Sequence, residues 1–91
     1  MNKKELVRAV ANKTNNQLGL TSDIVSATFE CIMEAVANGE KIQIVDFGSF
    51  EAKNRAAKVS RNPKTGEVVN VPPFRSPAFK AGKGFKDKVN G

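Results

Sequence analysis

The 91-residue chain has no histidine, tryptophan or tyrosine, and its only cysteine is Cys31. A single cysteine excludes an intrachain disulfide, and the lack of histidine leaves no ligand set for a zinc ion. No paired carboxylates on one helix face and no glycine-rich phosphate loop are present to serve catalysis. We therefore expect no enzymatic activity, no metal and no cofactor, and we expect Cys31 to pack as a small hydrophobic residue.

Long apolar segments are also missing. No apolar run approaches the roughly 18 residues of a transmembrane helix, and the N-terminus has no signal-peptide pattern. No segment combines a basic face with the Trp, Phe and Leu face of a membrane-surface helix. These absences favour a soluble intracellular protein without a membrane partner.

Acidic residues are scarce in the second half of the chain. Residues 1–52 carry five Lys or Arg against seven Asp or Glu, a net charge of −2, whereas residues 53–91 carry ten against two, a net charge of +8. This asymmetry predicts a near-neutral body followed by a binding surface for a polyanion.

The chain is also too short for a large core. If residues 53–77 project as a ribbon, 66 residues remain, and a core of that size rarely supplies more than roughly 3 to 5 kcal/mol. With disulfides and zinc excluded, association of two copies is the remaining route to stability. We therefore expect an obligate homodimer.

Two helices are predicted in the first half. An apolar stripe over residues 3–14 follows Asn2, a favourable N-cap. The second helix begins near Gln17 or at Thr21, and it ends at Asn38-Gly39, a typical left-handed cap. Its apolar residues cover more than one stripe, which favours a position inside a dimer.

The rest of the chain alternates as strands do. Asp46-Phe47-Gly48 predicts a tight reversal, with Phe47 and nearby Phe50 in the core. Pro72-Pro73 belongs at a sheet edge or where a ribbon bends, because proline is excluded from central strands. The predicted elements are strands over residues 41–45, 49–60 and 67–76 and a short helix over residues 82–88.

The segment from Ser60 to Gly66 has the chemistry of a hairpin turn. Pro63 presets φ at one corner, and Gly66 accepts positive φ where the chain re-enters pairing. No acidic residue occurs between Lys53 and Gly66. Eight extended residues span about 26 Å, and a projecting basic hairpin of that length has a polyanion as its expected partner.

Three segments of the chain are distinctive: Phe47-Gly48-Ser49-Phe50, Arg61-Asn62-Pro63-Lys64-Thr65-Gly66 and Pro77-Ala78-Phe79-Lys80-Ala81-Gly82-Lys83. Together they resemble the HU and integration host factor family of bacterial histone-like DNA-binding proteins. The resemblance covers the whole chain and implies an α+β fold in an intertwined dimer. It implies two N-terminal helices, a three-stranded antiparallel sheet with a long β-ribbon arm, and a short C-terminal helix. Residues 1–91 would form one domain, with 1–52 and 77–91 as dimer body and 53–76 as arm.

The resemblance also implies function, since HU and integration host factor are established minor-groove architectural proteins. Pro63 at each arm tip would intercalate and bend duplex DNA, with Arg61 and Asn62 in the groove beside it. Binding would be largely nonspecific in sequence and would favour kinked, nicked or flexible DNA. It would compact the DNA of a bacterial nucleoid, with a plastid nucleoid or a phage-infected cell as the alternative locations. The other DNA-binding residues would be Lys3, Lys53, Arg55, Lys58, Lys64, Arg75, Lys80, Lys83 and Lys86. The dimer core would include Phe29, Ile32, Val36, Ile44, Phe47, Phe50 and Phe79.

Four positions depart from the family pattern. Asp46 stands where glycine is usual, Gly19 and Gly84 lie in segments that are usually helical, and Pro72-Pro73 doubles a single proline. We therefore expect a late start for the second helix, a short last helix and a stiffer arm base.

Two other functions are left open by these residues. A small basic protein with a projecting hairpin also suits structured RNA, and competition between bent DNA and RNA separates the two. A site-specific factor would favour one DNA sequence over random duplex by at least about 10³-fold.

Overall fold

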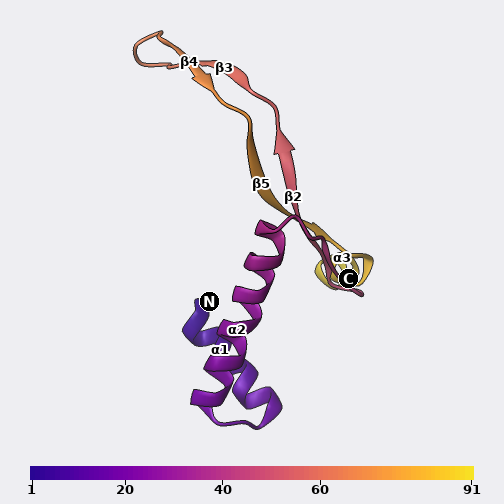
Figure 1. Cartoon of the computed structure of the whole chain (residues 1–91). Coiled ribbons are helices and arrows are strands. Elements are labelled where there is room, and N and C mark those ends of the chain that lie inside the picture. Colours follow the sequence, from indigo (N-terminus) through magenta and orange to yellow (C-terminus); the bar gives the residue numbers. More distant parts are fainter. The chain divides into compact units, whose positions relative to one another are not determined.

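The computed structural model describes all 91 residues, and the chain forms two compact units, Met1–Glu34 and Ala35–Gly91. Helices and antiparallel strands are both present, which confirms the predicted α+β class (Figure 1). No helix has the length and apolarity needed to cross a membrane. The elements are α1 (Lys3–Thr14), α2 (Leu18–Ala37), β1 (Ile42–Ile44), β2 (Gly48–Arg55), β3 (Lys58–Arg61), β4 (Val68–Val71), β5 (Phe74–Ala81) and α3 (Lys83–Asn90).

The N-termini of the two long helices compare differently with their predicted start positions. Asn2 caps α1 as predicted, because its side-chain oxygen accepts a hydrogen bond from the backbone N–H of Glu5 at 2.9 Å. Helix α2 begins at Leu18, so the earlier of the two predicted starts is correct and the expected late start is wrong. One glycine, Gly19, costs a helix only about 1 kcal/mol, which the remaining turns of a 20-residue helix outweigh.

The C-terminus of α2 ends at the predicted glycine. Gly39 has a φ of +87°. Its N–H donates to the carbonyl of Val36 at 3.0 Å, and the N–H of Glu40 donates to that of Ala35 at 2.9 Å. This pair of bonds is a Schellman cap, which glycine favours because it has no Cβ.

Few side chains are buried in the single chain. The buried apolar residues are Val7, Ala11, Val25 and Val36. Five large apolar side chains of α2 keep 41% to 63% of their surface exposed, and Cys31 is exposed as well. Packing of Cys31 as a small hydrophobe therefore requires a partner surface. The exposed large apolar residues of α2 beyond its first turn are Ile24, Phe29 and Met33.

Three antiparallel strands form the main sheet, in the order β1-β2-β5. The predicted reversal between β1 and β2 is confirmed, with Asp46 at a φ of +63° and the N–H of Phe47 donating to the carbonyl of Ile44 at 3.1 Å. Gly48 is buried, and a Cβ there would lie 2.5 Å from the carbonyl oxygen of Lys80. Only glycine therefore lets β2 and β5 approach at this point.

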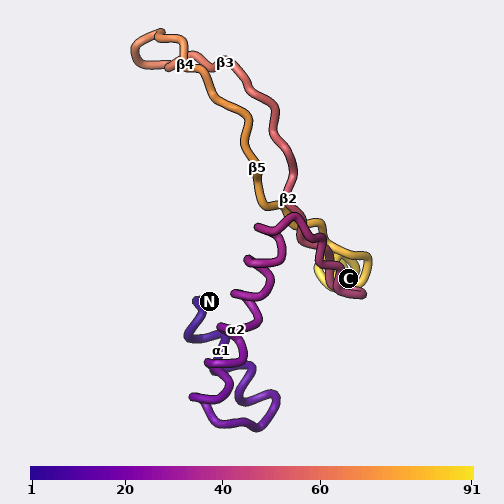
Figure 2. Tube along the Cα trace, in the orientation of Figure 1, coloured from indigo at the N-terminus to yellow at the C-terminus, as the bar shows by residue number.

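The outer part of the ribbon is a separate two-stranded ladder, β3-β4. The prediction of two continuous strands is wrong, because both are interrupted, one at Ala56-Ala57 and the other at Pro72-Pro73. Proline has no N–H for the ladder, so pairing stops where the two prolines lie. Figure 2 shows the two runs of chain continuing side by side to the closing loop.

The pairing register is the same on both sides of the interruption. Arg55 is opposite Phe74 before it, and Lys58 is opposite Val71 after it. Each strand thus leaves two residues unpaired, and no bulge shifts one strand against the other. The return strand extends further than predicted, to Ala81, and α3 follows as the expected short helix.

Candidate nucleic-acid interface

The tip of the ribbon is a four-residue loop closed by backbone hydrogen bonds. The N–H of Asn62 donates to the carbonyl of Glu67, and the N–H of Gly66 donates to the carbonyl of Asn62, both at 2.8 Å. The side-chain oxygen of Asn62 accepts from the N–H of Lys64 at 2.9 Å. Gly66 has a φ of +73°, which confirms the predicted turn chemistry. Pro63 is exposed at the start of this loop.

Cationic side chains lie on both faces of the ribbon. Lys53 and Arg55 share a face because they are two residues apart in β2, whereas Arg75 is opposite Asn54 on the other face. In the outer ladder Lys58 and Arg61 also lie on opposite faces, since they are three residues apart. A ribbon charged on both faces can contact both walls of a groove. All the predicted cationic residues of the ribbon and tip are exposed: Lys53, Arg55, Lys58, Arg61, Lys64 and Arg75.

Arg75 makes a contact that sequence reasoning missed. Its Nη2 donates to the backbone carbonyl of Ala37, the last residue of α2, at 2.9 Å. A cation is favourable at a helix C-terminus because the last carbonyls lack partners there. No local pattern reveals this contact, because the two residues are 38 positions apart.

A second group of lysines surrounds the start of α3. Lys80 lies in β5, and Lys83 and Lys86 lie in the first turn of α3; all three are exposed. The N-cap residue, Gly82, supplies no side-chain bond, and no acidic residue belongs to the first turn. The partial positive charge of the helix end adds to that of the lysines, which makes this region attractive to anions.

A cluster of aromatic rings holds α3 against the sheet. Phe47 contacts Phe79 and Phe85 with ring centroids 5.3 and 5.4 Å apart, and Phe50 contacts Phe79 at 4.9 Å. The predicted core residues of this region therefore meet. Phe47 and Phe79 nevertheless keep 42% of their surface exposed in the single chain. Lys80 and Lys83 owe their positions to this cluster.

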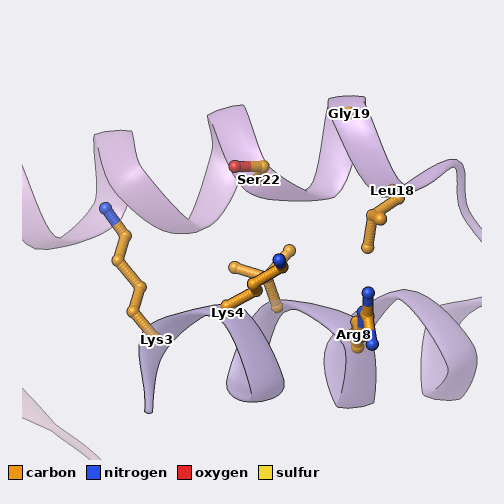
Figure 3. A pocket seen from close by; sticks show the side chains of 7 residues that line it. Lys3, Lys4, Arg8, Leu18, Gly19 and Ser22 are labelled. Atoms are coloured by element: carbon orange, nitrogen blue, oxygen red, sulfur yellow. The ribbon is translucent and has the colours of Figure 1, made fainter.

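The remaining predicted residues are divided between the two units. Lys3 lies in α1 (Figure 3) and belongs to the unit Met1–Glu34, whereas the other predicted DNA-contact residues belong to the unit Ala35–Gly91. Ile32 is half-buried and Val36 is buried, while Phe29 and Ile44 each keep 41% of their surface exposed.

Comparison with known proteins assigns the family. The sequence profile of the bacterial DNA-binding proteins matches residues 1–90. The DNA-binding protein HU of a Synechocystis strain is 52% identical over 95 residues, covering 98% of this chain and 95% of that protein. The HU protein of Clostridium pasteurianum is 48% identical, with 99% of each chain covered. This chain belongs to the HU family.

Solved HU structures have the same fold. A chain of an Anabaena HU–DNA cocrystal structure matches with a TM-score of 0.93 at 48% identity, covering 98% of this chain and 97% of that one. HU from Thermotoga maritima matches with a TM-score of 0.69 at 38% identity, covering 98% of both chains. The α+β architecture with a projecting ribbon is therefore a property of the HU family.

Proposed function

We propose that this chain is an architectural DNA-binding protein that bends and compacts duplex DNA as a homodimer, with little sequence preference. The observation that carries the proposal is the basic ribbon whose closed turn presents Pro63, in a chain of the HU family. The HU relative from Anabaena, at a TM-score of 0.93, was solved with DNA. The protein is not an enzyme.

A second copy of the chain completes the core. The exposed apolar residues of α2 and the half-exposed aromatic cluster need a partner surface, and an identical chain offers the same apolar side chains. Residues 1–52 and 77–91 form the dimer body, and residues 53–76 form the arm, all within one domain. The dimer core contains Phe29, Ile32, Val36, Ile44, Phe47, Phe50 and Phe79.

The arm follows the minor groove and Pro63 enters the base stack. The rigid proline ring has no N–H to leave unpaired and loses little entropy on insertion. Unstacking a step costs a few kcal/mol, which the additional phosphate contacts of bent DNA offset. Arg61 and Asn62 lie in the groove. The phosphate contacts are Lys53, Arg55, Lys58, Lys64 and Arg75 on the arm and Lys3, Lys80, Lys83 and Lys86 on the body.

Sequence preference is weak because the minor groove offers a degenerate pattern of donors and acceptors. Deformable DNA is preferred, since a nick or kink lowers the energy of bending. The protein acts in the bacterial cytoplasm, on the DNA of the nucleoid. A plastid or a phage-infected cell would offer the same substrate.

A bend-angle measurement by energy transfer between the ends of a duplex, with and without a central nick, tests the proposal. We expect a bend on both duplexes and tighter binding to the nicked one. Six to ten phosphate contacts should lower affinity by about 10³- to 10⁵-fold between about 50 and 200 mM salt. A straight duplex in the complex, or binding that salt does not weaken, would contradict the proposal, and so would a monomeric mass in solution.

A further inference from the structure

The amide side chain of Asn62 is held in one orientation by the loop at the tip of the ribbon. Its Oδ1 accepts a hydrogen bond from the backbone N–H of Lys64 at 2.9 Å. A backbone N–H can only donate, so the end of the amide that it meets must be the oxygen. This bond therefore settles which end of the side chain carries the Nδ2 group.

The Nδ2 group is the one hydrogen-bonding group of Asn62 that the loop leaves without a partner. The backbone N–H of Asn62 donates to the carbonyl of Glu67, and its carbonyl accepts from the N–H of Gly66, both at 2.8 Å. Asn62 is half-buried, and no enclosed polar side-chain atom of the chain lacks a hydrogen bond, so Nδ2 is open to solvent. The tip thus offers a partner two N–H donors from this side chain.

A group that can only donate meets two kinds of base pair in a minor groove. An A·T pair offers acceptors alone, adenine N3 and thymine O2, whereas a G·C pair adds the amino group of guanine, which is a second donor. The Nδ2 group can therefore donate to any A·T pair, but at a G·C pair it faces a group of its own kind. Pro63 follows Asn62 directly, so the base pairs in question are those beside the step that Pro63 enters.

We propose that Asn62 makes binding favour A·T over G·C pairs next to the step that Pro63 enters. The proposal rests on the proposed function, which places the tip in the minor groove, and it gives a direction to a preference that is weak overall. One hydrogen bond gained at A·T and lost at G·C corresponds to about threefold to tenfold in affinity. That ratio stays far below the roughly 10³-fold of a site-specific factor.

Nicked duplexes that differ only beside the nick test this inference. Three duplexes carry A·T, G·C or inosine·cytosine pairs on both sides of a central nick. Inosine lacks the amino group of guanine, so its pair with cytosine offers the acceptors of the minor groove without the extra donor. Fluorescence anisotropy at about 50 mM salt, where phosphate contacts keep affinity high, measures binding to each. We expect the A·T and inosine·cytosine duplexes to bind alike, and both about threefold to tenfold more tightly than the G·C duplex.

The N62D variant separates the amide from the shape of the DNA. Aspartate keeps an oxygen that can accept from the N–H of Lys64, but it has no N–H to donate. The control variant N70D makes the same change on β4, opposite Val59 and outside the closing loop. Both variants lose affinity through the added negative charge, so the ratio between duplexes is the readout. N62D should lose or reverse the A·T preference, whereas N70D should keep the original ratio. Thermal melts check that both variants are folded.

Each contrary result has a separate meaning. If the original protein binds all three duplexes alike, the inference is wrong and the proposed function stands. If N62D keeps the A·T preference, the deformability of the DNA causes it and Asn62 does not. If the inosine·cytosine duplex binds as weakly as the G·C duplex, the amino group of guanine is not what the protein detects. If the original protein binds no nicked duplex, the proposed function fails, and the inference fails with it.

Discussion

The guanidinium of Arg75 donates a hydrogen bond from Nη2 to the carbonyl oxygen of Ala37 at 2.9 Å. This bond joins strand β5 of the ribbon base to the last residue of α2. Arg75 therefore has a structural role in addition to the phosphate contact proposed for it. Arg55, on the adjoining strand and also exposed, offers a matched comparison.

The R75Q variant should unfold more easily than R55Q. Loss of one hydrogen bond at an exposed site lowers the free energy of unfolding by about 0.5 to 1.5 kcal/mol, whereas R55Q should leave it unchanged. Thermal melts at equal protein concentration measure the difference. R55Q should still weaken DNA binding. Equal melting temperatures for the two variants would show that the Arg75 bond adds nothing to stability.

Gly84 and Gly19 should respond oppositely to alanine. A Cβ at Gly84 would lie 2.7 Å from the carbonyl oxygen of Asp46 and 2.9 Å from its Cβ, whereas one at Gly19 would meet nothing within 4 Å. G84A should therefore destabilise the protein by roughly 1 to 3 kcal/mol. G19A should stabilise it by up to about 1 kcal/mol, because alanine is the better helix former. Chemical denaturation measures both, and a stabilising G84A would contradict the close packing.

Replacement of Pro63 should separate bending from binding. The backbone bonds that close the turn involve Asn62, Gly66 and Glu67, so P63A should keep the turn. The dimer and most phosphate-driven affinity should remain, while most of the bend disappears. P77A removes a proline from β5, outside the closing loop, and serves as the control. The end-to-end distance of a labelled duplex reports the bend, and an unchanged angle in P63A would exclude intercalation by Pro63.

Gly66 should be important for the backbone conformation of the turn, and not because a larger side chain would clash there. Its φ is +73°, yet a Cβ there would meet no atom within 4 Å. G66A should strain the turn by about 1 to 2 kcal/mol and weaken binding to nicked DNA, because the turn that presents Pro63 becomes less favourable. G66N should keep affinity, since asparagine tolerates positive φ. If G66A and G66N bind alike, the turn conformation does not govern recognition.

Stability should depend on protein concentration. An obligate dimer melts at a higher temperature as its concentration rises, because association favours the folded state. F29A should lower the melting temperature and weaken association, since Phe29 lies on the exposed apolar part of α2. V59A, a smaller apolar truncation on the ribbon where Val59 is 70% exposed, should not. Sedimentation at several concentrations checks the mass, and a concentration-independent melt would contradict dimerisation.

Local chemistry made part of the fold predictable. Asn2, Gly39 and the turn from Asn62 to Gly66 all act through bonds to residues a few positions away, and the structure has each where the sequence predicts it. The side-chain or backbone preferences of these residues are therefore enough to determine the local structure at each place.

Features that depend on a distant partner could not be predicted in the same way. Ala56-Ala57 lies opposite Pro72-Pro73 and is unpaired because proline has no N–H to donate across the ladder. The Arg75 to Ala37 bond and the packing of Gly84 on Asp46 also join residues far apart in sequence. For the candidate interface, the basic hairpin followed from the residues, whereas the individual roles came from the family resemblance.

The interruption of the ribbon has a mechanical consequence. Because two residues on each strand are unpaired and the register is unchanged, no ladder hydrogen bond fixes the angle between the outer and the inner ladder at this point. We therefore expect the angle between the two ladders to change when DNA is bound, without loss of a hydrogen bond from either ladder and within the range that the fixed φ of Pro72 and Pro73 allows.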